Sequence, residues 1–346
     1  MERIKSVKKI LMSILKLAVS GIAAGVILSA FSLIYYNPPV AAPQPDKTTN
    51  SKFEENKSWS VMTEGFGYGK TDSSGYNNSY YDGCTDPDVV VIGSSQTEAL
   101  QVGHRDNFVY LLNEMLATDG KEGNDLKCIN RGVSAHFFNV TSSNFKYVAE
   151  QYKDADYIVI EVNKVFFDAK TLDKMAEGGY HSDLAPRSKL YTLAQNIPAF
   201  RLLRLKINEF MEKDGGAGNI TPTADDIAYY SDKMNVVLAD IAKISEQYGI
   251  KTVILCHNTI DIDKNTATPS KTTQEYYDAF EKCCEDNGIE LLNATDAFCD
   301  NYEKTYQLPY GYSNTTPGTG HLNAHGHRVI AEVLYDRLNE AEGENR

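Results

Sequence analysis

Four polar segments have the residue types needed for acyl transfer. Ser95 follows the apolar run DVVVIG, Asn163 follows the run YIVIEV, a Gly132–Ala135 turn lies between them, and His321 stands near the C-terminus. An unactivated serine hydroxyl is a weak nucleophile and needs a base within hydrogen-bond reach. His321 is the candidate base. The combination therefore indicates a Ser–His pair acting on an acyl group.

A tetrahedral intermediate also needs donors directed at its oxyanion. We expect three: the backbone N–H of Ser95, a backbone N–H of Gly132 or Ala135, and the side-chain amide of Asn163. Two further residues beside this turn are candidate substrate contacts, Arg131 and His136.

Structural roles are possible at the same positions. Ser95-Gln-Thr-Glu98 fits a capping box, which can coexist with a nucleophilic role. Asn163 also suits a strand-end turn, and Asn323 is expected as the N-cap of the last helix rather than a substrate contact.

Metal and nucleotide chemistry fit the sequence less well. His321, His325 and His327 are clustered, but zinc sites usually add a second cluster, and no suitably spaced acids are nearby. The stretch Gly65–Thr71 has three residues between glycines where a phosphate loop needs four. We therefore expect no metal and no cofactor.

The elements that must position these residues alternate between strand and helix. Short runs rich in β-branched residues, apolar on both faces, are typical of a parallel sheet covered by helices. They are 88–93, 126–130, 157–162, 251–256 and 289–292. Helical patterns separate or follow them at 96–117, 144–152, 224–248, 272–287 and 324–338. This alternation predicts an α/β fold, a three-layer αβα sandwich of flavodoxin-like type with a five-stranded parallel sheet.

The N-terminal region has a different composition. Residues 1–16 carry five basic residues and one acid, and residues 17–36 carry no charge. The uncharged stretch is long enough to span a membrane as a helix. A basic segment before it and no lysine near its far end predict a cytoplasmic N-terminus, with the rest of the chain outside. A cleaved signal with a site near Ala41-Ala42-Pro43 is the alternative.

The remainder of the chain divides into a linker and one large domain. Residues 37–58 are proline-rich and polar, which predicts a flexible tether, and residues 59–346 form the α/β domain. We expect 165–222 to be an insertion that can lie over the site. Six cysteines without regular spacing are too few for a disulfide scaffold, so free thiols are expected.

Charge excludes one class of partner. The net charge of the whole chain is −13, and because the first 16 residues contribute +4, the remainder carries −17. A nucleic-acid partner requires a basic face, so this acidic body argues against nucleic-acid binding.

The four polar segments, in this order, resemble the four blocks of the SGNH (GDSL-type) hydrolase superfamily. Gly93-Ser94-Ser95 is similar to the G-D-S block, and Asn130–Ala135 to the N-x-G-x-S-G block. Glu161-Val162-Asn163 resembles the G-x-N block, and His321–His327 resembles the D-x-x-H-x-N-x-x-G-H block. The resemblance implies Ser95 as nucleophile, His321 as base and Asn163 in the oxyanion hole.

Three positions depart from the family pattern. Ser94 replaces the aspartate of G-D-S, Ala135 replaces the oxyanion glycine, and Gly318 stands three residues before His321, where the family has its aspartate. His321 then needs another group to hold its tautomer. We expect the Gly318 carbonyl, with Asp296 as a less favoured substitute.

The resemblance implies a serine esterase. Together with the N-terminal segment and the tether, it predicts a membrane-anchored, extracytoplasmic enzyme that removes O-acyl groups, O-acetyl above all, from cell-surface glycans. Its partners would be an acylated glycan or other ester and the membrane. The alternative is an O-acyltransferase that modifies cell-surface polysaccharide through the same acyl-enzyme, with a membrane-bound acyltransferase as partner. A second alternative, prompted by Gly318, is a catalytically degenerate glycan-binding or assembly protein.

Overall fold

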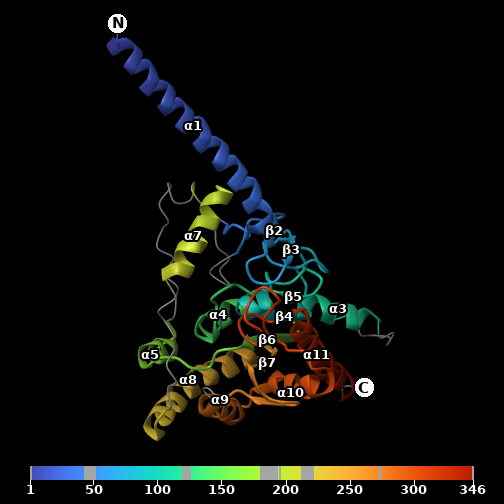
Figure 1. Cartoon of the computed structure of the whole chain (residues 1–346). Coiled ribbons are helices and arrows are strands. Elements are labelled where there is room, and N and C mark those ends of the chain that lie inside the picture. The colour runs from blue at the N-terminus through green and yellow to red at the C-terminus, as the bar shows by residue number, and fades with distance from the viewer. Residues whose placement is uncertain are drawn as a thin grey trace.

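The structure is a computed structural model that describes residues 2–42, 52–118, 126–179, 194, 196–211, 222–271 and 274–344. Its centre is a five-stranded sheet in which all strands are parallel, in the order β10-β7-β6-β4-β5 (Figure 1). The strands are β4 (Val89–Ile92), β5 (Cys128–Asn130), β6 (Tyr157–Val162), β7 (Lys251–Cys256) and β10 (Glu290–Asn293). The predicted parallel sheet and all five of its strands are confirmed.

Helices cover both faces of this sheet, so the three-layer prediction is also confirmed. Along β4, Val90 and Ile92 point to one hydrophobic cluster, whereas Val89 and Val91 point to the other. The first cluster is closed by α4 (Phe138–Gln151), α5 (Ala169–Ala176), α8 (Ala224–Tyr248) and α9 (Gln274–Asp286). The second is closed by α3 (Phe108–Thr118), α10 (Ala294–Thr305) and α11 (Ala324–Glu344).

The helix predicted over 96–117 is wrong as one element. It is divided into α2 (Ser95–Glu98) and α3 by a segment that begins at Ala99, whose φ is +56°. This segment pairs with a glycine-rich stretch far upstream, where the Phe66 N–H donates to the Gln101 carbonyl (3.2 Å). Tertiary contacts therefore override a continuous helical pattern.

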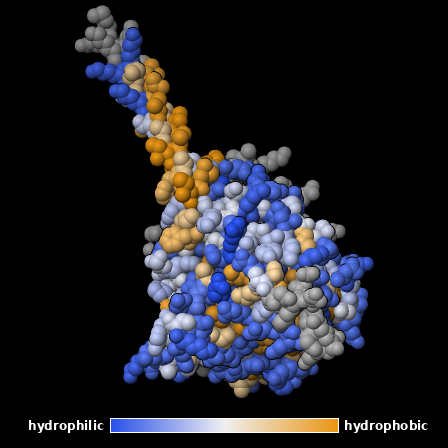
Figure 2. All heavy atoms as spheres, turned by 90° about the vertical axis from the view of Figure 1, so that its right-hand side faces the viewer, coloured by the Kyte–Doolittle hydropathy of each residue, from blue (hydrophilic) through white to orange (hydrophobic). Residues whose placement is uncertain are grey.

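The N-terminal helix α1 (Glu2–Tyr35) leads into a small antiparallel sheet of β1 (Tyr36–Asn37), β2 (Ser58–Val61) and β3 (Gly67–Lys70). Within α1, residues Lys8–Tyr35 are long and apolar enough to cross a membrane and are almost entirely exposed. Figure 2 shows an apolar stretch of α1, with hydrophilic residues toward its free end, projecting from a largely hydrophilic body.

The tether expected over 37–58 is fixed at both ends in the structure. The Ala42 N–H donates to the Lys52 carbonyl and the Glu54 N–H to the Val40 carbonyl, each at 2.8 Å. Residues 43–51 of this tether lie outside the described residues. The flexible spacer is thus corrected, at its described ends, to part of the small sheet region.

The segment expected as an insertion, 165–222, contains α5 and α7 (Pro198–Met211). α5 packs against α8, and α7 packs against α1 (Figure 1). Residues 180–193, 195 and 212–221 of this segment lie outside the described residues. A hairpin of β8 (Ile260–Asp263) and β9 (Thr266–Pro269) follows β7 and was not predicted.

Candidate active site

Ser95 is placed at the carboxyl end of β4 by a sharp strand-to-helix turn. The N-cap of α2 is Ser94, whose hydroxyl accepts from the Gln96 N–H (3.3 Å), and Ser95 is the first helical residue. The proposed capping role of Ser95 is therefore wrong, because Ser94 takes that role. The Ser95 side chain is left to project from the turn, half-buried.

His321 lies against this hydroxyl. Its Nε2 is 2.9 Å from Ser95 Oγ, although the two residues are 226 positions apart. On the other side of the imidazole ring, Nδ1 is 2.6 Å from Glu64 Oε2. Because a carboxylate holds the proton on Nδ1, Nε2 is free to accept the serine proton. The three side chains form a serine–histidine–carboxylate array.

Glu64 was not among the residues expected here. It also accepts the His321 backbone N–H at Oε1 (2.8 Å), so one carboxylate fixes both the ring and the backbone. Burial raises the pKa of Glu64, but the hydrogen bonds and charge of His321 outweigh it and leave this pKa below its ordinary value. Glu64 is therefore ionised at neutral pH.

The expected substitutes for the missing aspartate are corrected by this geometry. Gly318 lies in a turn with φ +79°, where its N–H donates to the Tyr310 carbonyl (3.0 Å). Asp296 is exposed in the first turn of α10. Glu64 precedes Ser95 in the chain, whereas the family pattern has its acid three residues before the histidine. No signal in the sequence pattern therefore pointed to Glu64.

One asparagine holds the loop that carries Glu64. Asn314 Nδ2 donates to the carbonyls of Met62 (3.0 Å) and Gly65 (3.2 Å), and its Oδ1 accepts the Gly65 N–H (3.0 Å). A side chain at Gly65 would meet the Gln101 carbonyl oxygen at 2.2 Å. The loop is thus fixed both by Asn314 and by close packing.

Two of the expected oxyanion donors lie against the segment that carries Ser95: Asn163 contacts Ser94, and Gly132 approaches Thr97 and Glu98. The Ser94 hydroxyl donates to Asn163 Oδ1 (3.4 Å), so this contact does not use the Asn163 NH₂ group. Ala135 has φ +64°, an unusual conformation for alanine, at the tip of its turn. The Gly132 N–H already donates to Asn130 Oδ1 (2.8 Å), so Ala135 rather than Gly132 is the donor candidate in this turn.

Gly132 has a steric role instead. A Cβ at this position would lie 2.3 Å from the Glu98 backbone nitrogen and 2.5 Å from the Thr97 carbonyl carbon. Only glycine allows the turn to approach α2 this closely. Glu98 then accepts hydrogen bonds from both the N–H (3.1 Å) and the hydroxyl of Ser134. Burial raises the pKa of the Glu98 carboxyl to about 7.

A second carboxylate–imidazole–hydroxyl array lies buried beneath the site. Glu161 Oε1 is 3.0 Å from His257 Nε2, and His257 Nδ1 is 2.5 Å from Tyr310 Oη. Glu161 Oε2 accepts the N–H (2.8 Å) and hydroxyl (2.9 Å) of Ser94 and the hydroxyl of Thr97 (3.0 Å). Burial raises the pKa of Glu161, and these hydrogen bonds and His257 lower it further than burial raises it. The buried Glu161 carboxylate therefore holds the turn that carries Ser95 by hydrogen bonds to Ser94 and Thr97.

Arg131 is not a substrate contact in this structure. It is only 4% exposed, and its guanidinium carbon lies 3.8 Å from the centre of the Tyr76 ring. His136 is half-buried beside the same turn, and burial lowers its pKa to about 4, so it is neutral. His136 stays a candidate contact, whereas Arg131 braces the fold.

The other two C-terminal histidines contact side chains other than Ser95 and Glu64. His325 Nε2 is 2.7 Å from Asn301 Oδ1, and His327 is buried and stacks on Phe108. In the described part of the chain, no three His, Cys, Asp or Glu side chains are grouped so as to hold a metal ion. All six cysteines are free thiols, and five of them are buried.

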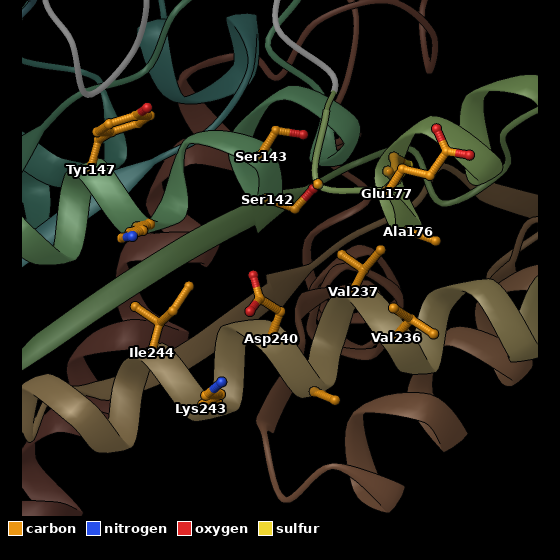
Figure 3. Close-up of a pocket in the computed structure, with 14 residues that line it drawn as sticks. Ser142, Ser143, Tyr147, Ala176, Glu177, Val236, Val237, Asp240, Lys243 and Ile244 are labelled. Atoms are coloured by element: carbon orange, nitrogen blue, oxygen red, sulfur yellow. The ribbon is translucent and has the colours of Figure 1, made fainter.

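A separate pocket of about 540 Å³ lies between α4, α5 and α8 (Figure 3). Its lining includes Ser143 and Tyr147 of α4 and Asp240 and Lys243 of α8. None of the residues around Ser95 lines this pocket, so it is distinct from the site described above.

Comparisons with known proteins give likenesses in structure only. No protein-family model and no curated protein sequence matches the chain. It is similar to the structure of an α/β-hydrolase enzyme from the metagenome of Lake Arreo, Spain, at 17% identity and TM-score 0.41, over 71% of this chain and 92% of that one.

Two other solved structures are similar at lower identity. One is a catalytic mutant of an acetylxylan esterase from Geobacillus stearothermophilus, at 12% identity and TM-score 0.39, over 71% of this chain and 91% of that one. The other is a GDSL-like lipase from Bacteroides thetaiotaomicron, at 13% identity and TM-score 0.37, over 73% and 88% of the two chains. The chemistry proposed for this chain rests on its own side chains.

Proposed function

We propose that this chain is a serine esterase in which Ser95, His321 and Glu64 act together. The observation that carries the proposal is the pair of contacts made by His321, 2.9 Å to Ser95 Oγ and 2.6 Å to Glu64 Oε2. The degenerate, non-catalytic alternative was prompted by glycine at position 318. Glu64 supplies the missing carboxylate from another part of the chain and removes that reason.

The arrangement supports a two-step acyl-enzyme mechanism. Ser95 Oγ attacks the ester carbonyl carbon while His321 Nε2 takes its proton, and His321 then returns that proton to the departing alkoxide. In the second step His321 takes a proton from water, the resulting hydroxide attacks the acyl carbon, and Ser95 Oγ leaves with the proton. The N–H groups of Ser95 and Ala135 and the Asn163 amide are the donors proposed for the oxyanion.

We further propose that the esterase is anchored in the cell membrane by α1 with its catalytic domain outside, and that its substrates are O-acylated, above all O-acetylated, surface glycans. The end of α1 supports an anchor over a cleaved signal. Ser32 is fully buried, and cleavage near Ala42 would remove β1 from its pairing with β2. The extracytoplasmic side follows from the basic residues that precede the apolar stretch.

A glycan substrate has support from aromatic side chains next to the Glu64 loop. A cavity of about 610 Å³ there is lined by residues that include Phe66, Tyr306 and Tyr312. Phe66 and Tyr306 expose 57% and 59% of their surface. Aromatic rings with polar neighbours offer the flat apolar surface and oriented hydrogen bonds that small-molecule sites use.

The test is a fluorophosphonate reaction on the full chain in detergent, read by peptide mass spectrometry. We expect one adduct, on Ser95, that is absent from His321→Ala while His325→Ala reacts as the parent does. No adduct on a folded parent chain would refute the esterase. A second assay uses acetylated xylan as donor and a sugar alcohol as acceptor. Release of acetate indicates hydrolysis, whereas acetylation of the sugar alcohol indicates the O-acyltransferase alternative, which would work with a membrane-bound acyltransferase.

A further inference from the structure

The last turn of α1 is joined directly to the hairpin that carries Glu64. The Tyr35 carbonyl accepts the Met62 N–H (2.9 Å), and the Leu33 carbonyl accepts the Ser60 hydroxyl (3.0 Å). Tyr36 packs on the small apolar cluster of Trp59, Val61 and Leu100. The apolar helix is therefore continuous with the folded domain rather than separated from it by a spacer.

This joint places the reaction centre close to the end of α1. Glu64 is two residues after Met62, and two residues span at most about 7 Å even when fully extended. Ser95 Oγ is reached from Glu64 through one imidazole ring and its two contacts of 2.6 and 2.9 Å. If α1 enters a bilayer, the nucleophile lies near the surface of that bilayer.

α7 lies beside the same end of α1 (Figure 1). Arg201 Nη1 donates to the Pro38 carbonyl (2.8 Å), which attaches α7 to the chain that follows α1. Two large apolar side chains one helical turn apart on α7, Leu203 and Ile207, expose 56% and 49% of their surface. Ile197, just before α7, exposes 52%. Apolar exposure of this kind next to a membrane helix is typical of an interfacial helix.

The charge of α7 also differs from that of the domain. Its sequence PAFRLLRLKINEFM has three basic residues and one acid, whereas the chain after residue 16 carries −17. Basic residues among exposed apolar ones match the phosphate and acyl regions of a lipid surface.

We propose that the exposed apolar surface formed by Leu203 and Ile207 of α7, with Ile197 just before the helix, is a membrane-docking surface. Its partner is the headgroup layer of the bilayer that α1 enters. The inference rests on the membrane anchoring proposed above and deepens it: docking of α7 holds Ser95 at the lipid surface, so the ester substrates are those carried by or lying on that bilayer.

The test places a fluorophore on single cysteines of the full chain in nanodiscs of phosphatidylcholine and phosphatidylglycerol that contain a spin-labelled quencher lipid. Cys84, the one thiol that is not buried, is first changed to serine. The labelled variants are Leu203→Cys on α7, Val26→Cys in α1, and Ile262→Cys on β8, whose side chain is 42% exposed and serves as the matched control.

We expect Leu203→Cys and Val26→Cys to be quenched at least threefold more than Ile262→Cys. Quenching of Val26→Cys without Leu203→Cys would overturn the docking surface and leave the anchor intact. An unquenched Val26→Cys would overturn both. If the Leu203→Cys fluorophore is shielded from the quencher lipid only at high protein concentration, a second copy of the chain covers α7, and this result would also overturn the proposal.

A kinetic comparison separates docking from chemistry. The double variant Leu203→Glu, Ile207→Glu should turn over an acyl ester embedded in the nanodisc bilayer about tenfold more slowly than the parent chain. Its kcat/KM for a water-soluble acetyl ester and its fluorophosphonate reaction at Ser95 should stay within twofold, as should both values for the control Ile262→Glu. An unchanged rate on the embedded ester would contradict the proposal.

Discussion

The carboxylate of Glu64 lies 2.6 Å from Nδ1 of His321, across 257 positions of sequence. The same carboxylate accepts the His321 backbone N–H (2.8 Å), so it fixes both the ring and the main chain of the base. The acid that orients His321 thus lies in the β2–β3 hairpin next to α1, which precedes β4, the first strand of the central sheet, in the chain.

Removing the charge of Glu64 should reduce the reaction without unfolding the chain. In Glu64→Gln the side chain no longer favours the proton on Nδ1 or stabilises a protonated His321, so we expect kcat to fall by about 10²- to 10⁴-fold. The measurement is steady-state hydrolysis of a soluble acetyl ester. Glu55→Gln, an exposed change on the preceding loop, is the control. A Glu64→Gln rate within threefold of the parent would mean that another group orients His321.

Asn163 is expected to act on the transition state rather than on binding. Loss of one oxyanion donor costs about 10²- to 10³-fold in kcat, so Asn163→Ala should lose rate with little change in KM. The remote Asn287→Ala, whose side chain bonds Asn235 and the Cys283 carbonyl, should leave both parameters unchanged. A higher KM with normal kcat would instead assign Asn163 to substrate binding.

The buried carboxylate of Glu161 should be needed for stability and for the position of the nucleophile. Glu161→Gln replaces one acceptor oxygen by a donor that faces N–H or O–H groups, and leaving buried donors without an acceptor costs about 1–3 kcal/mol. Chemical denaturation should show this loss. Glu150→Gln, on the exposed side of α4, should be neutral. An equally stable Glu161→Gln chain would show that the buried array does not hold the Ser94 turn.

The stability of the chain should depend on Glu98 between about pH 5 and 8. Burial raises the pKa of Glu98 from 4.5 to about 7, so the folded state holds a proton that the unfolded state releases. Stability is therefore greatest below pH 4.5 for this group and falls as pH rises to 7, by about 3 kcal/mol. In Glu98→Gln this loss should disappear, as measured by denaturant midpoints at pH 5 and 8. A parallel pH dependence in both proteins would contradict the assignment.

Gly132 should tolerate no side chain. Gly132→Ala places a Cβ 2.3 Å from the Glu98 nitrogen, so the turn or α2 must move, and we expect a loss above about 2 kcal/mol with reduced activity. Gly179→Ala is the matched control, because no atom lies within 4 Å of its added Cβ. Equal stability of the two variants would show that the turn adapts without cost.

The sequence by itself determined the central sheet and placed two candidate site residues, Ser95 and Asn163, at the ends of its strands. Five apolar, β-branched runs between helical patterns favour a covered parallel sheet, because helices on both sides of such a sheet bury both faces of its strands. Ser95 and Asn163 follow two of these strands directly, and parallel strands bring their carboxyl ends to one edge.

Only the tertiary structure decided which acid serves His321, which serine caps α2 and what Arg131 does. Glu64 lies in a glycine-rich stretch with no periodicity, and nothing local relates it to a histidine 257 residues away. Ser94 and Ser95 are adjacent and chemically identical, so only their contacts separate their roles. Ser94 bonds Glu161 and the Gln96 N–H, which leaves Ser95 to face His321. Arg131 is enclosed by aromatic rings from distant segments. These contacts join segments that are distant in the sequence and meet only when long loops fold back. Local residue types and spacing therefore do not reveal them.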